Sequence, residues 1–256
     1  MRRPFTLTFP SGAVASRIRV GNPAELPVAL RRIGLDQPRP TLALVGGAKG
    51  LAVDEMAQLQ TLFENVIAPT AEQLALYVVD GGTEAGIMSL MGEARAAVNG
   101  TFSLIGVAAT GTVALPTQTP IPEDAALLEP HHTHFVLVPG TRWGDEAMWI
   151  SEVASALSDG LPSLTLLING GEITWLDARC SVQAGRPVLV LDGTGRTADA
   201  IAAALRGEPT DLRAADLVSS GLMGAMDIAS PREALVRAIE EALFRKGEED
   251  GAETTV

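Results

Sequence analysis

Short apolar runs alternate with amphipathic stretches along most of the chain, which predicts buried strands followed by helices. Residues 76–98 show this most clearly: the apolar run at 76–79 is followed by Asp-Gly-Gly at 80–82, and apolar residues then recur at helical spacing. Thr83 stands where a helix N-cap is expected. A strand, a glycine turn and a helix start in succession leave backbone N–H groups free at the positive end of the helix dipole. This unit therefore predicts an anion-binding site.

The same unit recurs along the chain. Expected strands lie at 5–9, 14–20, 41–45, 76–79, 101–108, 132–138, 163–168 and 187–191. The helices that follow them are expected to end near residues 33, 67, 98, 157, 183 and 205. This alternation predicts an α/β fold with a Rossmann-like, open and mainly parallel sheet that carries helices on both faces.

After residue 206 the pattern becomes mainly helical. Residues 214–228 predict a weak helix, because Gly221 and Gly224 interrupt it. Residues 230–246 predict a stronger helix that begins with Ser-Pro-Arg-Glu, a favourable helix start. This last helix could pack on the domain, on a second copy in a homo-oligomer, or on an effector partner.

These patterns divide the chain of 256 residues into three parts. We expect residues 1–208 to form a Rossmann-like nucleotide-binding domain, which includes a strand and helix extension at 1–40. Residues 209–246 are expected to form a C-terminal helical extension. Residues 247–256 hold four acidic and no basic residues, which predicts a disordered acidic tail.

Composition narrows the possible functions. The net charge of −12 argues against a nucleic-acid binder and against electrostatic docking on an anionic membrane. Cys180 is the single cysteine, so an internal disulfide is excluded. No apolar run approaches the roughly 20 residues of a membrane span, and the N-terminal residues lack a signal-peptide core. We therefore expect a soluble cytoplasmic protein.

Glycine-rich corners follow the expected strands, and in a parallel sheet such corners meet along one edge. At the last corner Arg196 could add a guanidinium to the free N–H groups and so hold a phosphate, or it could pair with Asp199 on the surface. The glycines could instead serve tight packing alone, but we favour ligand contact because several similar turns converge. The candidate ligand-binding residues are Gly46, Gly47, Gly81, Gly82, Thr83, Gly86, Thr110, Gly111, Gly140, Thr141, Gly144, Glu146, Gly193, Thr194, Gly195 and Arg196.

Other candidate motifs give weaker evidence for a binding site. Lys49 follows a glycine pair that lacks the Gly-Lys-Ser/Thr ending of a P-loop, so we interpret it as a solvated turn residue. His131, His132 and His134 invite a metal site, but zinc needs further ligands. We favour a role in orienting loops, and we expect neither a bound metal nor a cofactor.

Glu146 has two interpretations. A carboxylate at a helix start is favoured by the helix dipole whatever the function. It could also hold a ribose hydroxyl or act on a glycosidic bond. No Gly-x-Ser-x-Gly elbow is present, so a serine hydrolase is not indicated.

Five segments, taken in order, resemble the SLOG domain of melastatin-type TRP channels. They are ASRIRVGNPAELPVALRRIG, PTLALVGGAKG, VVDGGTEAGIMSLMGEA, HHTHFVLVPGTRWGDEA and PVLVLDGTGRTADAIA. They correspond to that domain's leading strand and helix, its strand followed by Gly-Gly, its "TGG…TGV" turn, its "HSHF" strand and its "DGSGR..D" turn. The resemblance covers about residues 14–205, and we expect a free-standing prokaryotic form.

The resemblance implies a Rossmann-like fold that binds ADP-ribose or a related nucleotide. By position, Gly81, Gly82 and Thr83 would line the nucleotide. The turn at 193–196 would hold phosphate, and Gly140, Thr141 and Gly144 would close the cleft.

The wider superfamily includes LOG-type phosphoribohydrolases, which carry a Pro-Gly-Gly-x-Gly-Thr-x-x-Glu motif. Residues 139–146 keep its first Pro-Gly and its Glu but lack the second Gly and the Gly-Thr pair. We therefore favour a sensor of an ADP-ribose-like nucleotide, which would relay its occupancy through the C-terminal helix. The alternatives are an N-glycosidic hydrolase of nucleoside phosphates that uses Glu146, and a structural subunit with an empty cleft.

Overall fold

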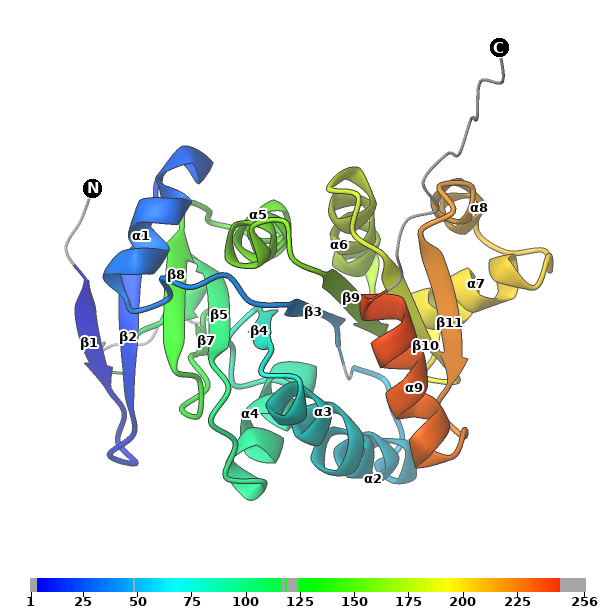
Figure 1. Ribbon diagram of the computed structural model, residues 1–256, viewed down its shortest axis with the longest axis horizontal. Coiled ribbons are helices and arrows are strands. Elements are labelled where there is room, and N and C mark those ends of the chain that lie inside the picture. The colour runs from blue at the N-terminus through cyan, green and yellow to red at the C-terminus, as the bar shows by residue number, and fades with distance from the viewer. Residues whose placement is uncertain (1–3, 48, 117, 119–123, 245–256) are drawn as a thin grey trace, which may run out of the picture.

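A computed structural model describes residues 4–244 apart from 48, 117 and 119–123, and it shows one large sheet with helices on both faces (Figure 1). Within these residues the sheet has nine strands in the order β1-β2-β8-β5-β4-β3-β9-β10-β11. The strands are β1 (Phe5–Thr8), β2 (Val14–Arg19), β3 (Thr41–Gly46), β4 (Tyr77–Asp80), β5 (Leu104–Ala109), β8 (His134–Val138), β9 (Ser163–Ile168), β10 (Val188–Asp192) and β11 (Met223–Asp227). All neighbours are parallel except β1, which is antiparallel to β2. The predicted open, mainly parallel α/β sheet is confirmed.

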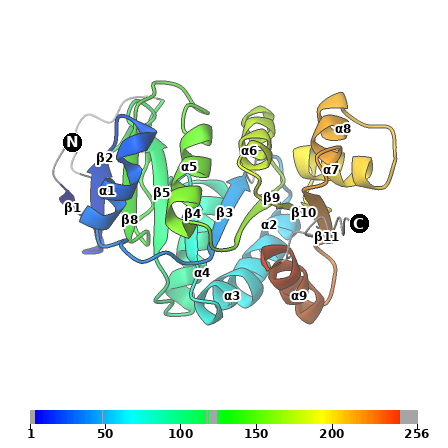
Figure 2. The same cartoon turned by 45° about the horizontal axis from the view of Figure 1, so that its top comes forward.

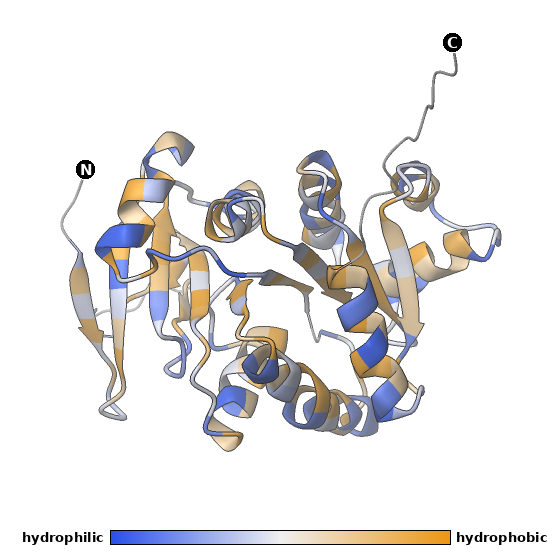
Figure 3. Ribbon diagram, in the orientation of Figure 1, coloured by the Kyte–Doolittle hydropathy of each residue, from blue (hydrophilic) through white to orange (hydrophobic). Residues whose placement is uncertain are grey.

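Each face of the sheet is covered by its own set of helices (Figures 1 and 2). One face carries α1 (Leu26–Arg32), α5 (Ala147–Ser158), α6 (Glu172–Gln183), α7 (Arg196–Leu205) and α8 (Leu212–Val218). The other carries α2 (Val53–Leu62), α3 (Ala68–Gln73), α4 (Gly86–Ala97) and α9 (Arg232–Leu243). Alternate strand residues enter opposite cores: Ala43 and Val45 of β3 face the first set, whereas Leu42 and Leu44 face the second. The central strands are therefore apolar on both sides, and Figure 3 shows that most of their residues are hydrophobic.

The strand order reverses between β3 and β9. From β3 the chain adds β4, β5 and β8 on one side, and it then returns to add β9, β10 and β11 on the other. The helices that follow β3 and β9 lie on opposite faces of the sheet, so their connecting loops diverge at the carboxyl edge. In open α/β sheets this switch point is where ligands bind.

Several predicted element boundaries are wrong. Thr83 does not cap a helix, because α4 begins at Gly86 with Ala85 as N-cap. The strand expected at 101–108 begins at Leu104. The one expected at 132–138 begins at His134, because His132 lies in the turn before it.

One further boundary differs from expectation. The helix expected to end near residue 67 continues to Gln73 through a π-helical turn at Phe63–Ile67. The connection between β5 and β8 contains a short parallel pair, β6 (Val113–Ala114) and β7 (Ala126–Leu127).

The segment 209–246 is not the purely helical extension that was expected. Residues 223–227, the second half of the expected helix at 214–228, form strand β11, which pairs in parallel with β10. The following helix α9 buries Leu235, Ile239 and Leu243 in the core under the sheet. Its apolar face is therefore used within the chain. The expected acidic tail at 247–256 lies outside the described residues.

Candidate functional site

A cleft of about 140 Å³ opens at the switch point, above the carboxyl ends of β3, β4 and β5. The beginnings of α5 and α6 form its opposite wall. Its lining residues are Leu44, Val45, Gly46, Gly81, Thr83, Met88, Ala108, Thr112, Val113, Trp143, Glu146, Ile150, Ile173, Thr174 and Asp177. The cleft thus combines apolar walls, three threonines, one aromatic residue and two carboxylates.

Gly46 forms the floor of the cleft because its backbone passes very close to the next strand. It has a φ of +128°, and a Cβ built on it would lie 1.9 Å from the carbonyl oxygen of Ile168. That oxygen also accepts a hydrogen bond from the N–H of Gly47, at 3.2 Å. Any larger residue at 46 would push β3 away from β9 at the switch point itself.

Two carboxyl groups face the cleft from its helical wall. Glu146 directly precedes α5, and both of its oxygens accept the N–H of Gly144, at 3.1 and 3.0 Å. Burial raises the pKa of Glu146, and these amide contacts oppose the rise. Asp177, on α6, is only 8% exposed, and burial together with the charge of Glu146 raises its pKa to about 7. The pair therefore holds a proton near neutral pH more readily than ordinary carboxylates.

The turn after β4 is held by a buried row of three charged side chains, Asp80, His132 and Glu129. Nε2 of His132 lies 2.8 Å from Oδ1 of Asp80, and Nδ1 lies 2.7 Å from Oε2 of Glu129. Burial alone would lower the pKa of His132, but the two carboxylates outweigh it and raise that pKa to about 9. His132 is therefore an imidazolium between two carboxylates, and Oδ2 of Asp80 is buried with no partner among the described residues.

This buried row positions the glycine turn that borders the cleft. Oδ1 of Asp80 accepts the N–H of Gly82 at 2.7 Å, and the carbonyl of Gly82 accepts the N–H of Glu129 at 3.0 Å. The carboxylate of Glu129 lies on Gly92 of α4, where a Cβ would be 2.2 Å from it. His132 thus orients a loop, as was expected of it. His134 instead contacts the carbonyl of Ile33 through Nε2, at 3.0 Å.

The backbone N–H groups at the corner after β10 already donate to a side chain of this chain. Oδ1 of Asp199 accepts the N–H groups of Gly193 and Gly195, both at 2.9 Å. Thr194 accepts the N–H of Asn169, at 2.8 Å, and so joins this corner to the end of β9. Asp199 therefore contacts the backbone rather than Arg196, the partner that the surface-pair alternative gave it.

The corner after β8 is closed in the same way. Oδ2 of Asp145 accepts the N–H groups of Thr141 and Arg142, at 2.9 and 3.0 Å. The N–H of Gly111 donates to the carbonyl of Gly140, at 2.9 Å. A carboxylate thus already occupies the positions that an anion would take at this corner.

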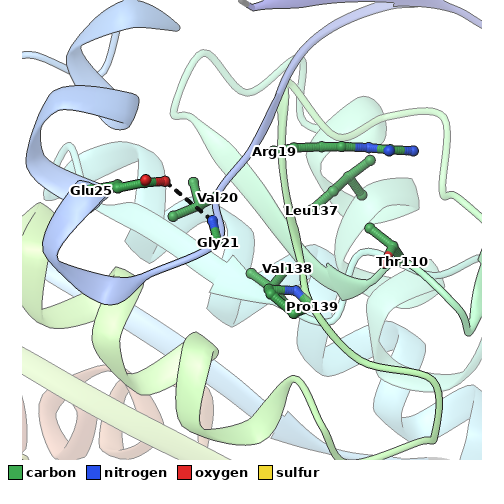
Figure 4. Close-up of a pocket in the computed structure, with 8 residues that line it drawn as sticks. All are labelled: Arg19, Val20, Gly21, Glu25, Thr110, Leu137, Val138 and Pro139. Carbon is green, nitrogen blue, oxygen red and sulfur yellow. Dashed lines mark hydrogen bonds between the residues drawn. The ribbon is translucent and has the colours of Figure 1, made fainter. Parts of the chain in front are cut away.

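A second hollow, of about 350 Å³, lies farther along the same edge between β2 and β8 (Figure 4). Arg19 extends over Leu137 toward Thr110, and the N–H of Gly21 donates to Glu25 at 3.2 Å. Thr110 faces this hollow rather than the cleft at the switch point.

The parallel sheet brings all the predicted corners to one edge, but only some of their residues line the cleft. Those that do are Gly46, Gly81, Thr83 and Glu146. Gly82 is buried against Gly106, where a Cβ would lie 2.7 Å from that residue's Cα, so packing explains its lack of a side chain. The remaining predicted residues lie on the same edge outside the lining: Gly47, Gly86, Thr110, Gly111, Gly140, Thr141, Gly144, Gly193, Thr194, Gly195 and Arg196.

Sequence reasoning missed Asp177 and Trp143. Asp177 carried a usable signal, because it lies on the buried face of α6 between Trp175 and Ala178, where a charged residue is unusual. Within the described residues no group of three or more His, Cys, Asp or Glu could hold a metal ion. No helix in the same residues has the length and apolar character to cross a membrane.

Comparison with known proteins agrees with this architecture. Residues 39–236 match the family described as SLOG in TRPM, prokaryote. Transient receptor potential cation channel subfamily M member-like 2 of Nematostella vectensis is 27% identical over 209 residues, which is 67% of this chain and 13% of that protein. Subfamily M member 2 of Mus musculus is 25% identical over 204 residues, which is 66% of this chain and 13% of that protein. The chain thus spans a small fraction of the curated relatives that it matches. The family match extends from before β3 into α9, and on this basis the chain belongs to the family described as SLOG in TRPM, prokaryote.

Proposed function

We propose that this chain binds a nucleotide-derived ligand, ADP-ribose or a close relative, at the β3–β9 switch point and acts as a cytoplasmic ligand sensor. The observation that carries the proposal is the close placement of two unlike surfaces at one sheet edge. One is the carboxylate- and threonine-bearing cleft, and the other is the exposed guanidinium of Arg196 beside Gly171. A nucleotide has parts that suit each of them, since its sugar donates hydrogen bonds and its phosphates are anionic.

Arg196 is the residue to which we assign the phosphate. A Cβ built on Gly171 would lie 2.7 Å from Nη2 of Arg196, so the guanidinium of Arg196 lies against the start of α6. Arg196 is also the first residue of α7. Its φ of +53° places a non-glycine residue in the left-handed region, at a cost of about 1–3 kcal/mol. A strained backbone that presents an exposed cation at two helix starts supports anion binding.

Calorimetry with ADP-ribose tests the proposal. We expect Arg196→Ala to weaken binding about 10- to 100-fold, because a charge-assisted phosphate contact contributes about 1.5–3 kcal/mol. Arg179→Ala, which removes an exposed arginine from α6, is the matched control and should leave the affinity unchanged. Absence of binding by the unmodified protein would refute the proposed function.

A second candidate function is N-glycosidic hydrolysis of a nucleoside monophosphate. The pair of carboxyl groups in the cleft favours it, because one protonated and one ionised carboxyl group are what general acid and base chemistry on a glycosidic bond requires. Incubation with AMP, followed by chromatography for free adenine, tests it. Release of adenine that Glu146→Gln abolishes would support the enzyme.

The proposed relay of occupancy to an effector must spare the apolar side of α9, because that side is buried in the core of the chain. A partner would therefore contact the exposed side of this helix, which begins with Arg232 and Glu233.

A further inference from the structure

The cleft is electrostatically unsuited to a phosphate. Among the described residues that line it, none is Lys, Arg or His, whereas Glu146 and Asp177 both face it. The walls are mostly apolar, so the charges of these groups are poorly screened. A phosphate drawn into this space would meet like charge.

Asp177 has hydrogen-bonding capacity that the chain itself does not use. Its side chain is more than nine-tenths buried, it lines the cleft, and it has no hydrogen-bond partner among the described residues. Burying such a group without a partner costs free energy. A ligand that donates hydrogen bonds would recover that cost.

Glu146 is held in place, and its carboxylate keeps acceptor sites that no described residue uses. Its two contacts with the N–H of Gly144 fix the carboxylate at the start of α5, yet a carboxylate has about four acceptor sites. Thr83 and Thr112 lie across the cleft, and Trp143, which is 46% exposed, stands among the lining residues. Carboxylates, hydroxyls and an indole together suit a sugar, which donates and accepts hydrogen bonds around an apolar ring face.

The size of the cleft limits what can enter. Small-molecule sites usually measure about 300–1,000 Å³, and this cleft is about 140 Å³. Only one ring of a nucleotide fits, so the rest must lie outside. Arg196 lies against Gly171, three residues before Thr174 of the cleft wall, and marks the direction in which the phosphates would leave.

We propose that Glu146 and Asp177 form a sugar subsite, in which they accept the ribose hydroxyls of the ligand while its phosphates lie outside the cleft toward Arg196. This inference rests on the proposed function and specifies the orientation of the bound nucleotide. It makes Asp177 a ligand-contacting residue.

Calorimetry of four proteins with ADP-ribose and with inorganic pyrophosphate tests the subsite. Glu146→Gln removes one acceptor, and Asp177→Leu replaces the carboxyl group by an apolar group of similar size. Glu152→Gln, an exposed glutamate of α5 outside the cleft, is the matched control for lost charge. We expect the two cleft variants to bind ADP-ribose at least tenfold more weakly and to bind pyrophosphate within twofold of the unmodified protein.

The sign of the change separates the alternatives. If phosphate entered the cleft, removing a carboxylate would strengthen the binding of both ligands, and that result would overturn the subsite. Unchanged affinity for ADP-ribose in both variants would also overturn it. If Arg196→Ala still weakened binding in that case, the proposed function would stand without the subsite. Absence of ADP-ribose binding by the unmodified protein is instead a failure of the proposed function.

A measurement on the unmodified protein covers the case in which a variant does not fold. Ribose 5-phosphate and 2-deoxyribose 5-phosphate carry the same phosphate and differ by one hydroxyl group. We expect the ribose form to displace ADP-ribose at a concentration at least tenfold lower. Equal competition by the two sugars, or none by ribose 5-phosphate, contradicts the subsite.

Discussion

Nε2 of His132 lies 2.8 Å from Oδ1 of Asp80, although the two residues are 52 positions apart in the chain. The same oxygen accepts the N–H of Gly82, so the imidazolium and the glycine turn share one carboxylate atom. The turn that borders the cleft is thereby held by a charge that is entirely buried. The stability of the fold and the geometry of the cleft thus depend on the same contact.

Removing this imidazolium should destabilise the protein strongly. His132→Gln would leave Asp80 buried without its histidine partner and would take from Glu129 one of its two histidine partners. Breaking such a buried pair costs about 3–5 kcal/mol. Urea unfolding followed by circular dichroism measures the loss. His131→Gln is the control: His131 also contacts Glu129, but its side chain is 41% exposed, so the expected loss is below about 1 kcal/mol. Equal losses in the two variants would contradict the role of His132.

The same group predicts a pH dependence. The pKa of His132 rises from about 6.5 to about 9 on folding, so its contribution is full below pH 6.5 and is lost as the pH rises through 9. The pKa of Glu129 is lowered: burial opposes the shift, but its two histidine partners outweigh it. The contribution of Glu129 is therefore present above about pH 4.5 and is lost as the pH falls. Unfolding free energies measured from pH 6 to 9.5 should fall for the unmodified protein and change less for His132→Gln.

Hydrophobic periodicity predicted the central part of this fold, because the central strands are apolar on both sides and their glycine corners interrupt them sharply. It failed at the edge. Strand β11 reads Met-Gly-Ala-Met-Asp and buries only Met223 and Met226, and that spacing of three is equally typical of a helix. The buried contact of His132 with Asp80 was equally hidden, because nothing in local spacing pairs two such distant residues.

The glycine corners also show that the sequence pattern does not reveal which groups contact one another. Their presence on one edge followed from the parallel sheet, but the sequence did not show which of their amides are free. Asp145 and Asp199 lie a few residues beyond their corners and fold back to accept those N–H groups. Asp177 lies in the second turn of α6 rather than at the end of a strand, so the pattern of glycine corners gives no indication of it.

Asp177 predicts a second pH effect in a lower range. Its pKa rises from about 3.8 to about 7 on folding, so the folded chain holds the proton more tightly, and stability falls as the pH rises from 4 to 7. Asp177→Asn removes this slope, because the amide stays neutral. Above pH 7 this variant should be more stable by up to about 4 kcal/mol, from about three pKa units at 1.36 kcal/mol each. Thermal unfolding at pH 4.5 and at pH 8 measures the difference.

Glu152→Asn serves as the control for Asp177, since it removes an exposed carboxylate on α5. Its stability relative to the unmodified protein should change little between the two pH values. If Asp177→Asn gave the same difference at pH 4.5 and pH 8, the raised pKa of Asp177 would be wrong.

Gly46 should tolerate no side chain, whereas its neighbour should. In Gly46→Ala the new Cβ would overlap the carbonyl oxygen of Ile168, and φ is +128°. We expect a loss of at least about 2 kcal/mol in unfolding free energy, from overpacking and backbone strain together. Gly47→Ala is the matched control, because a Cβ there meets no atom of the described residues within 4 Å. Similar stability of the two variants would contradict the close approach of β3 and β9.

Residues 209–244 should be necessary for a stable fold, although the sequence placed the domain boundary at 208. A chain that ends at residue 208 would expose the edge of β10 that β11 now covers. It would also lose Leu235, Ile239 and Leu243 from the core, and burying each such side chain contributes about 1.5–3 kcal/mol. That sum rivals the whole stability of a typical domain, which is about 5–15 kcal/mol. We therefore expect the shortened chain to aggregate or to unfold without cooperativity in a thermal melt.

A chain that ends at residue 244 keeps every contact described here, so it should melt like the full-length protein. A cooperative transition of the chain ending at 208, within a few degrees of that control, would show that the core is complete without β11 and α9.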